Sequence, residues 1–110
     1  MGLKQYDNLF TRLPYPIPDE VITTLVRNDS LIIERIVSLG QATPEGKWLQ
    51  QDTHEWVVLI QGAAKLLFEG EKKVRYMQPG DWCEIPSQCR HRVEWTDPSQ
   101  NTIWLAVHYK

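Results

Sequence analysis

The sequence predicts an all-β domain, arranged as a sandwich or a barrel of short strands. After residue 30, runs rich in Val, Ile, Leu and Trp recur at intervals of about ten residues, which is typical of such folds. Segments with turn-forming Gly, Pro, Asn or Asp, such as QATPEG and QPGD, separate these runs. We therefore expect strands near 31–39, 47–51, 54–61, 63–69, 73–78, 82–86, 91–96 and 101–109.

The first thirty residues have a different character. LPYPIP predicts a proline-rich extended arm, and the Pro-Asp-Glu that follows is typical of the start of a helix. We therefore expect a short helix over about 18–26, although the β-branched content of VITTLV favours the alternative, an edge strand. We divide the chain into an N-terminal arm, 1–30, and a β-barrel, 31–110.

Length and composition restrict the class of function. A chain of 110 residues is expected to form one domain. The net charge of −2 and the pI of 5.9 give no electrostatic support for binding nucleic acid or a membrane surface. The first residues, MGLKQYDNLF, lack the apolar stretch of a signal peptide, and no apolar run approaches the ~18 residues that a spanning helix needs, so we expect neither. Cys83 and Cys89 do not make a disulfide framework, so we expect free thiols and a cytoplasmic protein.

Alternation along the strands assigns some side chains to the interior. In HRVEWT, His91, Val93 and Trp95 share one face, and the charged Arg92 and Glu94 share the other, so the His91 face is expected to point inward. In HEWVVLIQ both alternating sets are mostly apolar. Periodicity alone therefore leaves open which set faces inward.

Two spaced motifs resemble the two halves of the cupin signature. The first cupin motif ends in a glutamate, six residues and a glycine, which match Glu55, WVVLIQ and Gly62. The second has a glycine, five residues, a proline and, five positions later, a histidine, which match GDWCEIPSQCRH at 80–91. The resemblance covers about 31–109 and is similar to small single-domain bacterial cupins. It implies an antiparallel double-sheet (jelly-roll) β-barrel, with the motif residues meeting near one open end.

The sequence also departs from the cupin pattern. Cupins place two histidines shortly before the glutamate, whereas here the corresponding positions within 48–51 hold Trp, Leu and Gln. Gln88 and Trp95 stand where the second motif usually has a glycine and an asparagine. Two of the four usual metal ligands are therefore missing, and a third is at best an amide.

The resemblance implies that Glu55 points inward beside His91. The two would hold a divalent metal such as Fe, Mn, Ni or Zn, with Gln51 as a weak oxygen donor. His54 is then turned outward by alternation, and it would join the ligands only if the chain bulges before it. The alternative is that Glu55 and His91 form a hydrogen-bonded ion pair that needs no metal.

Two classes of function follow. In the first, the protein is a metal-dependent cupin enzyme, an isomerase or a dioxygenase that acts on a small polar organic molecule. In the second, it is a non-catalytic barrel that binds a small apolar or aromatic ligand among its tryptophans, without a metal. The side chains expected to contact a ligand are Trp48, Trp82, Trp95 and His108. The proline-rich arm and the open-ended barrel favour a homodimer over a monomer.

Overall fold

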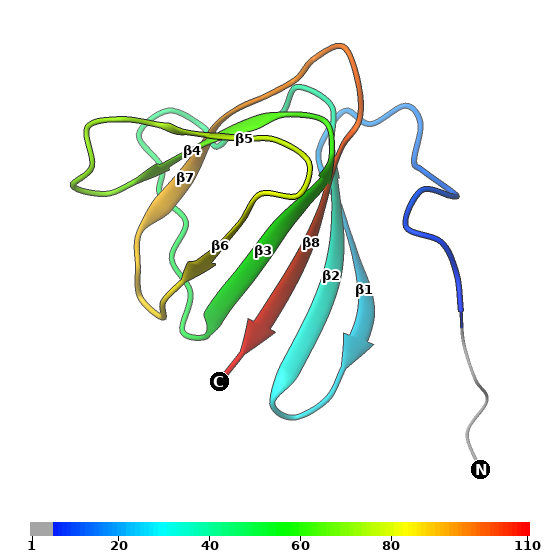
Figure 1. The fold of residues 1–110 in the computed structure, drawn as a ribbon, viewed down its shortest axis with the longest axis horizontal. Coiled ribbons are helices and arrows are strands. Elements are labelled where there is room, and N and C mark those ends of the chain that lie inside the picture. The colour runs from blue at the N-terminus through cyan, green and yellow to red at the C-terminus, as the bar shows by residue number, and fades with distance from the viewer. Residues whose placement is uncertain (1–5) are drawn as a thin grey trace.

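The structure, a computed structural model, describes residues 6–110, and within this range the chain is all-β. Its eight strands form two antiparallel sheets, in the orders β1-β2-β8-β3-β6 and β5-β4-β7 (Figure 1). The double-sheet fold expected from the sequence is thus confirmed. The strands are β1 Val21–Arg27, β2 Leu31–Ser38, β3 His54–Gln61, β4 Ala64–Phe68, β5 Arg75–Met77, β6 Trp82–Ile85, β7 His91–Thr96 and β8 Thr102–Tyr109.

The helix expected over 18–26 is wrong, because this segment contains the edge strand β1. β1 pairs with β2 from Val21 to Arg27, so its backbone groups are bonded to a neighbouring strand along one side. The β-branched residues of VITTLV suit a strand better than a helix, and here they outweigh the helix-start signal of the preceding residues. Within residues 6–110 there is no helix long and apolar enough to cross a membrane.

The segment expected to form a strand over 47–51 makes only an isolated bridge. Leu49 N–H donates to the carbonyl of His91 at 2.7 Å, and His91 N–H donates back to the carbonyl of Leu49 at 3.0 Å. This reciprocal pair fixes the first residue of β7 against the loop that precedes β3. The hydrogen bonds thereby join the 47–51 segment to β7, which lies about forty residues later in the sequence.

The hydrophobic core lies between the two sheets. It is formed by the inward-facing residues of β3, β4, β6 and β8, including Val57, Leu59, Leu66, Ile85 and Trp104. β1 and β2 lie on the side of the larger sheet away from β4, β5 and β7, so the smaller sheet covers only part of the larger one (Figure 1).

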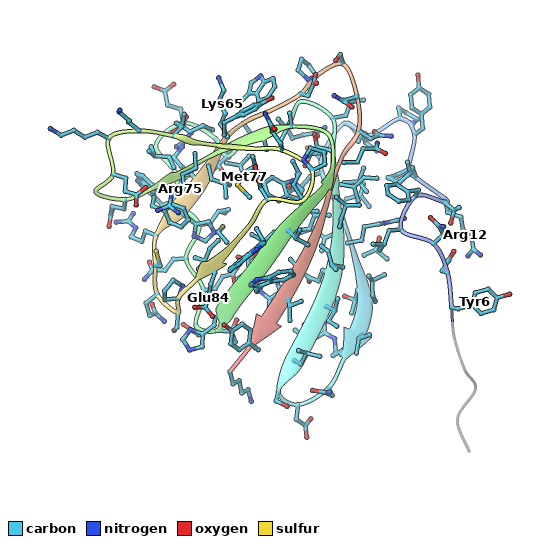
Figure 2. All side chains as sticks on the ribbon, in the orientation of Figure 1. Tyr6, Arg12, Lys65, Arg75, Met77 and Glu84 are labelled. Carbon is cyan, nitrogen blue, oxygen red and sulfur yellow. The ribbon has the colours of Figure 1, made fainter. Side chains whose placement is uncertain are left out.

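The N-terminal arm packs on the outer face of β1 and β2, beside which its labelled residues Tyr6 and Arg12 appear (Figure 2). Arg35 on β2 donates to the carbonyls of Leu9, at 3.2 Å, and Thr11, at 2.8 Å. Ile17 is buried, and its carbonyl accepts a hydrogen bond from Gln41 Nε2 at 2.7 Å. These hydrogen bonds tie the arm to its own chain, and the expected homodimer stays a prediction.

Gly62, the glycine of the first motif, is required by the turn between β3 and β4. Its φ of +91° lies in the left-handed region that glycine adopts readily. A Cβ at this position would also lie 2.4 Å from Thr102 Oγ1 and 2.7 Å from Thr102 Cα. The turn and the close approach of β8 therefore both exclude a side chain here.

Candidate functional site

A cavity of about 420 Å³ lies on the inner side of the five-stranded sheet. Its polar lining includes side chains from β2, the loop before β3, β3, β7 and β8, namely Glu34, Gln51, Glu55, His91 and His108. Its apolar lining includes Val57, Leu66, Ile85 and Trp104. The exposed residues Asp19, Glu20 and Ile22, at and before the start of edge strand β1, form part of its mouth. The size and the mixture of surfaces are those of a small-molecule site.

Glu55 lies on the inner face of β3, directly between β6 and β8. In the sheet it pairs with Ile85 on one side and with His108 on the other. The residue is only 7% exposed, yet its carboxylate makes no hydrogen bond with any residue of 6–110. Burial is the main reason that its pKa is raised above 4.5, with the neighbouring Glu34 adding to the effect and His108 and His91 opposing it.

His91 opens β7 opposite Glu55, and its ring orientation is fixed by the backbone. Its Nδ1 lies 3.0 Å from the carbonyl of Cys89, so this nitrogen carries a proton and donates it. In the neutral ring the lone pair is then on Nε2, which lies 3.8 Å from Glu55 Oε1. That separation is within ion-pair distance but exceeds hydrogen-bond length, so the structure contains the close approach of Glu55 and His91 without the hydrogen bond of the expected ion pair.

The loop before His91 keeps a glycine-like conformation although it has no glycine. Gln88 stands where the cupin motif has a glycine, and its φ of +69° lies in the left-handed region. Its N–H donates to the carbonyl of Gln51, and its side-chain amide donates to Asp52 Oδ1, both at 2.8 Å. These bonds to the 50–52 segment hold a conformation that is otherwise unfavourable for a side chain. They also position the Cys89 carbonyl that orients His91.

His108 forms a second glutamate–histidine pair, and this one is closed. Its Nε2 donates to Glu34 Oε1 at 2.9 Å, and its Nδ1 lies 3.0 Å from Gln51 Oε1. Both ring nitrogens are engaged whichever way the Gln51 amide is oriented. His108 therefore presents no free lone pair to the cavity.

The other residues predicted for the site lie outside the cavity lining. His54 is turned away, as alternation predicts: its Nδ1 accepts a hydrogen bond from Ser87 N–H at 3.0 Å, and its ring packs on Tyr109 at 5.3 Å. Trp82 is 61% exposed and packs on Trp56. Trp48 lies beneath the guanidinium groups of Arg90 and Arg92.

Trp95 was expected on the same face as His91, and that expectation is wrong. The β4–β7 register shifts between Leu66, which pairs with Val93, and Lys65, which pairs with Trp95. The extra residue in β7 makes a bulge that reverses the alternation. Lys65 points away from the interior (Figure 2), and its Nζ lies 5.3 Å from the centre of the Trp95 ring.

Two residues of the site were missed by the sequence analysis. Trp104 lines the cavity. It lies four positions before His108 on the last strand and so shares its face, which could have indicated it. Glu34 is a lone acid in the apolar run LIIERIV, which is a weak signal for a buried functional group. Only the pairing of β2 with β8 brings Glu34 near His108.

The donor set does not fit a resident catalytic metal. Within residues 6–110 no three His, Cys, Asp or Glu side chains converge as a metal site. Glu55 and His91 each have a free donor atom, but His108 and Gln51 are bonded to each other, and His54 faces away. A catalytic zinc normally has three protein ligands, and two are offered here.

Comparisons with known proteins found solved structures of the same fold. No family model and no curated protein matches the sequence. A protein of Ralstonia eutropha JMP134 named a "putative mannose-6-phosphate isomerase" is 45% identical, covers 97% of this chain and 99% of its own, and has a TM-score of 0.94.

Two further structures carry the cupin name and are more distant in sequence. An RmlC-like cupin with a double-stranded β-helix fold, from Methanocaldococcus jannaschii, is 17% identical over 99% of this chain and 92% of its own, with a TM-score of 0.72. A cupin superfamily protein of Desulfitobacterium hafniense DCB-2 is 15% identical over 96% of this chain and 98% of its own, with a TM-score of 0.70. At these identities the likeness concerns the fold alone.

Proposed function

The chain belongs to the cupin superfamily, and on that premise we propose that it binds a small polar organic molecule directly through Glu55 and His91, without a resident metal. The observation that carries this proposal is the pair formed by Glu55 and His91 in the cavity, which we call the open pair because its facing atoms are not hydrogen-bonded to each other. Two buried polar side chains face each other 3.8 Å apart, and neither cavity-facing group has a hydrogen-bond partner within residues 6–110. Both residues line the cavity and their facing atoms are free of partners within residues 6–110, so a ligand in the cavity can pair with both.

The name of the Ralstonia eutropha protein raises the question of a phosphorylated sugar. The cavity gives that substrate class little support, because within residues 6–110 its lining contains neither lysine nor arginine. Phosphate recognition in proteins rests on these cations or on helix N-termini. We therefore do not carry that substrate over to this chain.

Proton transfer is a second candidate function, favoured by the chemistry of the same pair. A carboxyl group whose pKa is raised by burial, facing an imidazole nitrogen 3.8 Å away, is a combination suited to taking and returning a proton. A metal-free isomerisation of the bound molecule would need these two groups and no others.

The proposal is tested by ligand-detected NMR with a library of small polar organic molecules. We expect ligands whose affinity falls at least about tenfold in Glu55→Gln and in His91→Ala, the loss expected for a charge-assisted hydrogen bond. The matched control is Glu71→Gln, an exposed carboxylate paired with Arg75 at the surface, which should leave affinity unchanged. The same samples in D2O report any hydrogen exchange at carbon, which would identify proton transfer.

Calorimetric titration with Fe, Mn, Ni and Zn salts tests the metal alternative. We expect weak binding at most, because a two-ligand anchor holds a divalent ion poorly. Near-stoichiometric tight binding that Glu55→Gln abolishes would overturn the metal-free proposal.

A further inference from the structure

We propose that the cavity is selective for a small organic cation, an amine with an apolar body. The inference rests on the proposed function, since it names the ligand class of the same site. Four carboxylates line the cavity, Asp19 and Glu20 at the mouth and Glu34 and Glu55 inside. Within residues 6–110 the lining holds no permanently positive side chain to balance them.

The two atoms that face each other in the open pair are both hydrogen-bond acceptors, so a ligand that pairs with them must supply donors. An ionised Glu55 accepts hydrogen bonds only, and His91 Nε2 is an acceptor in the neutral ring because Nδ1 donates to the Cys89 carbonyl. An ammonium group has several N–H donors and a positive charge, so one group can satisfy both acceptors. The carboxylate is more than nine-tenths buried and has no partner within residues 6–110, and this independent feature distinguishes the site from a solvated acidic patch.

The arginines of the adjacent strands are committed to the outer surface. Arg35 on β2 binds the carbonyls of the N-terminal arm. Arg92 on β7 donates to the carbonyls of Thr43, at 2.9 Å, and Lys47, at 3.0 Å. Because both guanidinium groups are held away from the cavity, they do not pair with the carboxylates that line it.

The two glutamates inside the cavity differ in how closely a histidine approaches them. The facing atoms of His108 and Glu34 lie 2.9 Å apart and are hydrogen-bonded, whereas His91 Nε2 and Glu55 Oε1 lie 3.8 Å apart. Inside the cavity, the carboxylate without a hydrogen-bonded partner among residues 6–110 is therefore Glu55, at the open pair. An added cation is attracted most strongly to this point.

The remaining lining explains why the cation should be organic. Val57, Leu66, Ile85 and Trp104 provide an apolar wall, which a bare or hydrated metal ion cannot use. Trp104 also offers an indole ring, the aromatic group that attracts cations best. The volume of about 420 Å³ is within the range of small-molecule pockets.

The test compares three probes with the same apolar body and different charge: benzylamine, benzyl alcohol and benzoate, with mannose 6-phosphate as a fourth. Dissociation constants are measured by NMR titration of the full chain near neutral pH and at low salt. We expect benzylamine to bind at least about tenfold more tightly than benzyl alcohol, the difference between charged and neutral hydrogen bonds. Benzoate and mannose 6-phosphate should bind more weakly than the alcohol.

Variants identify the groups responsible. Glu55→Gln keeps the shape of the side chain and should remove most of the amine preference while changing benzyl alcohol affinity by no more than about twofold. The double variant Asp19→Asn with Glu20→Gln, at the exposed mouth, should weaken the amine by only about two- to threefold, in a salt-dependent manner. Glu71→Gln is the control and should change neither affinity.

The outcomes separate the two proposals. If the alcohol binds as well as the amine and both depend on His91, the site is a ligand site but not a cation site. If benzoate or the sugar phosphate binds best, the cation class is likewise wrong. If no probe binds, the cation class is wrong, and the library screen decides the proposed function separately. If binding is unchanged in both Glu55→Gln and His91→Ala, the proposed function fails together with this inference.

Discussion

The two glutamate–histidine pairs on the inner side of the larger sheet are alike in composition and opposite in state. Glu34 and His108 are in contact at 2.9 Å, and the second nitrogen of His108 is engaged by Gln51. Glu55 and His91 stand 3.8 Å apart, with their facing atoms unpartnered within residues 6–110. The same two residue types thus serve one purpose when they are closed and another when they are open. We expect the closed pair to stabilise the fold, and we propose that the open pair binds a ligand.

The largest expected difference between the pairs is in stability. His108→Leu removes the donor to Glu34 and leaves a mostly buried carboxylate unpaired, so we expect a loss of about 2 kcal/mol in the free energy of unfolding. Glu55→Gln breaks no hydrogen bond to the described residues and should change that free energy by less than about 0.5 kcal/mol. Urea unfolding of both variants measures this. Equal losses in the two variants would show that the open pair is structural after all.

A smaller effect is expected in the pH dependence of stability. The pKa of Glu55 is raised above 4.5 by burial, so the folded protein binds this proton more tightly than the unfolded chain does. The contribution to stability is therefore complete below about 4.5 and is lost as the pH rises through the raised pKa of the folded state. His108, His91, Glu34 and Cys83 are the titratable groups that surround it.

Melting temperatures of the wild type and Glu55→Gln, recorded from acidic to neutral pH, test this sign. The variant should gain on the wild type as the pH rises, because it lacks the carboxyl group whose ionisation destabilises the fold. Glu71→Gln should show no such gain. The hydrogen bond from Arg75 lowers the pKa of Glu71, so ionisation of this group favours the folded state instead. If the melting temperature of Glu55→Gln instead fell relative to that of the wild type as the pH rises, the burial of an unpaired carboxylate at Glu55 would be contradicted.

The smallest effect is expected at Cys83, a buried thiol on β6. The structure has both cysteines free, as the sequence analysis predicted. Burial raises the pKa of Cys83 to about 11, and the charge of Glu55 adds to the rise. Glu55→Gln should therefore lower the pKa of Cys83 by a fraction of a unit and speed its alkylation. Mass spectrometry of iodoacetamide-treated protein over a range of pH separates Cys83 from Cys89, and an unchanged profile would show that the two groups do not interact.

The sequence by itself determined the fold class, whereas the approach of Glu55 to His91 was implied by its resemblance to the cupin motifs. Alternation and turn chemistry depend on local backbone geometry, so they predicted most strands without knowledge of their partners. The resemblance to the cupin motifs implied that Glu55 lies beside His91, and both residues line one cavity. The same local information left helix and strand in balance over 18–26, and pairing with β2 decided it.

Only the tertiary structure decided which pair is open and which tryptophans line the site. The register of β2 on β8 places Glu34 near His108, and the fold of the 48–52 segment brings Gln51 to the other ring nitrogen. A one-residue bulge in β7 turns Trp95 outward, while Trp104 lines the cavity instead. Register and bulges depend on contacts between segments that are far apart in the chain, so a shift of one residue reverses a side chain without leaving any periodic signal in the sequence.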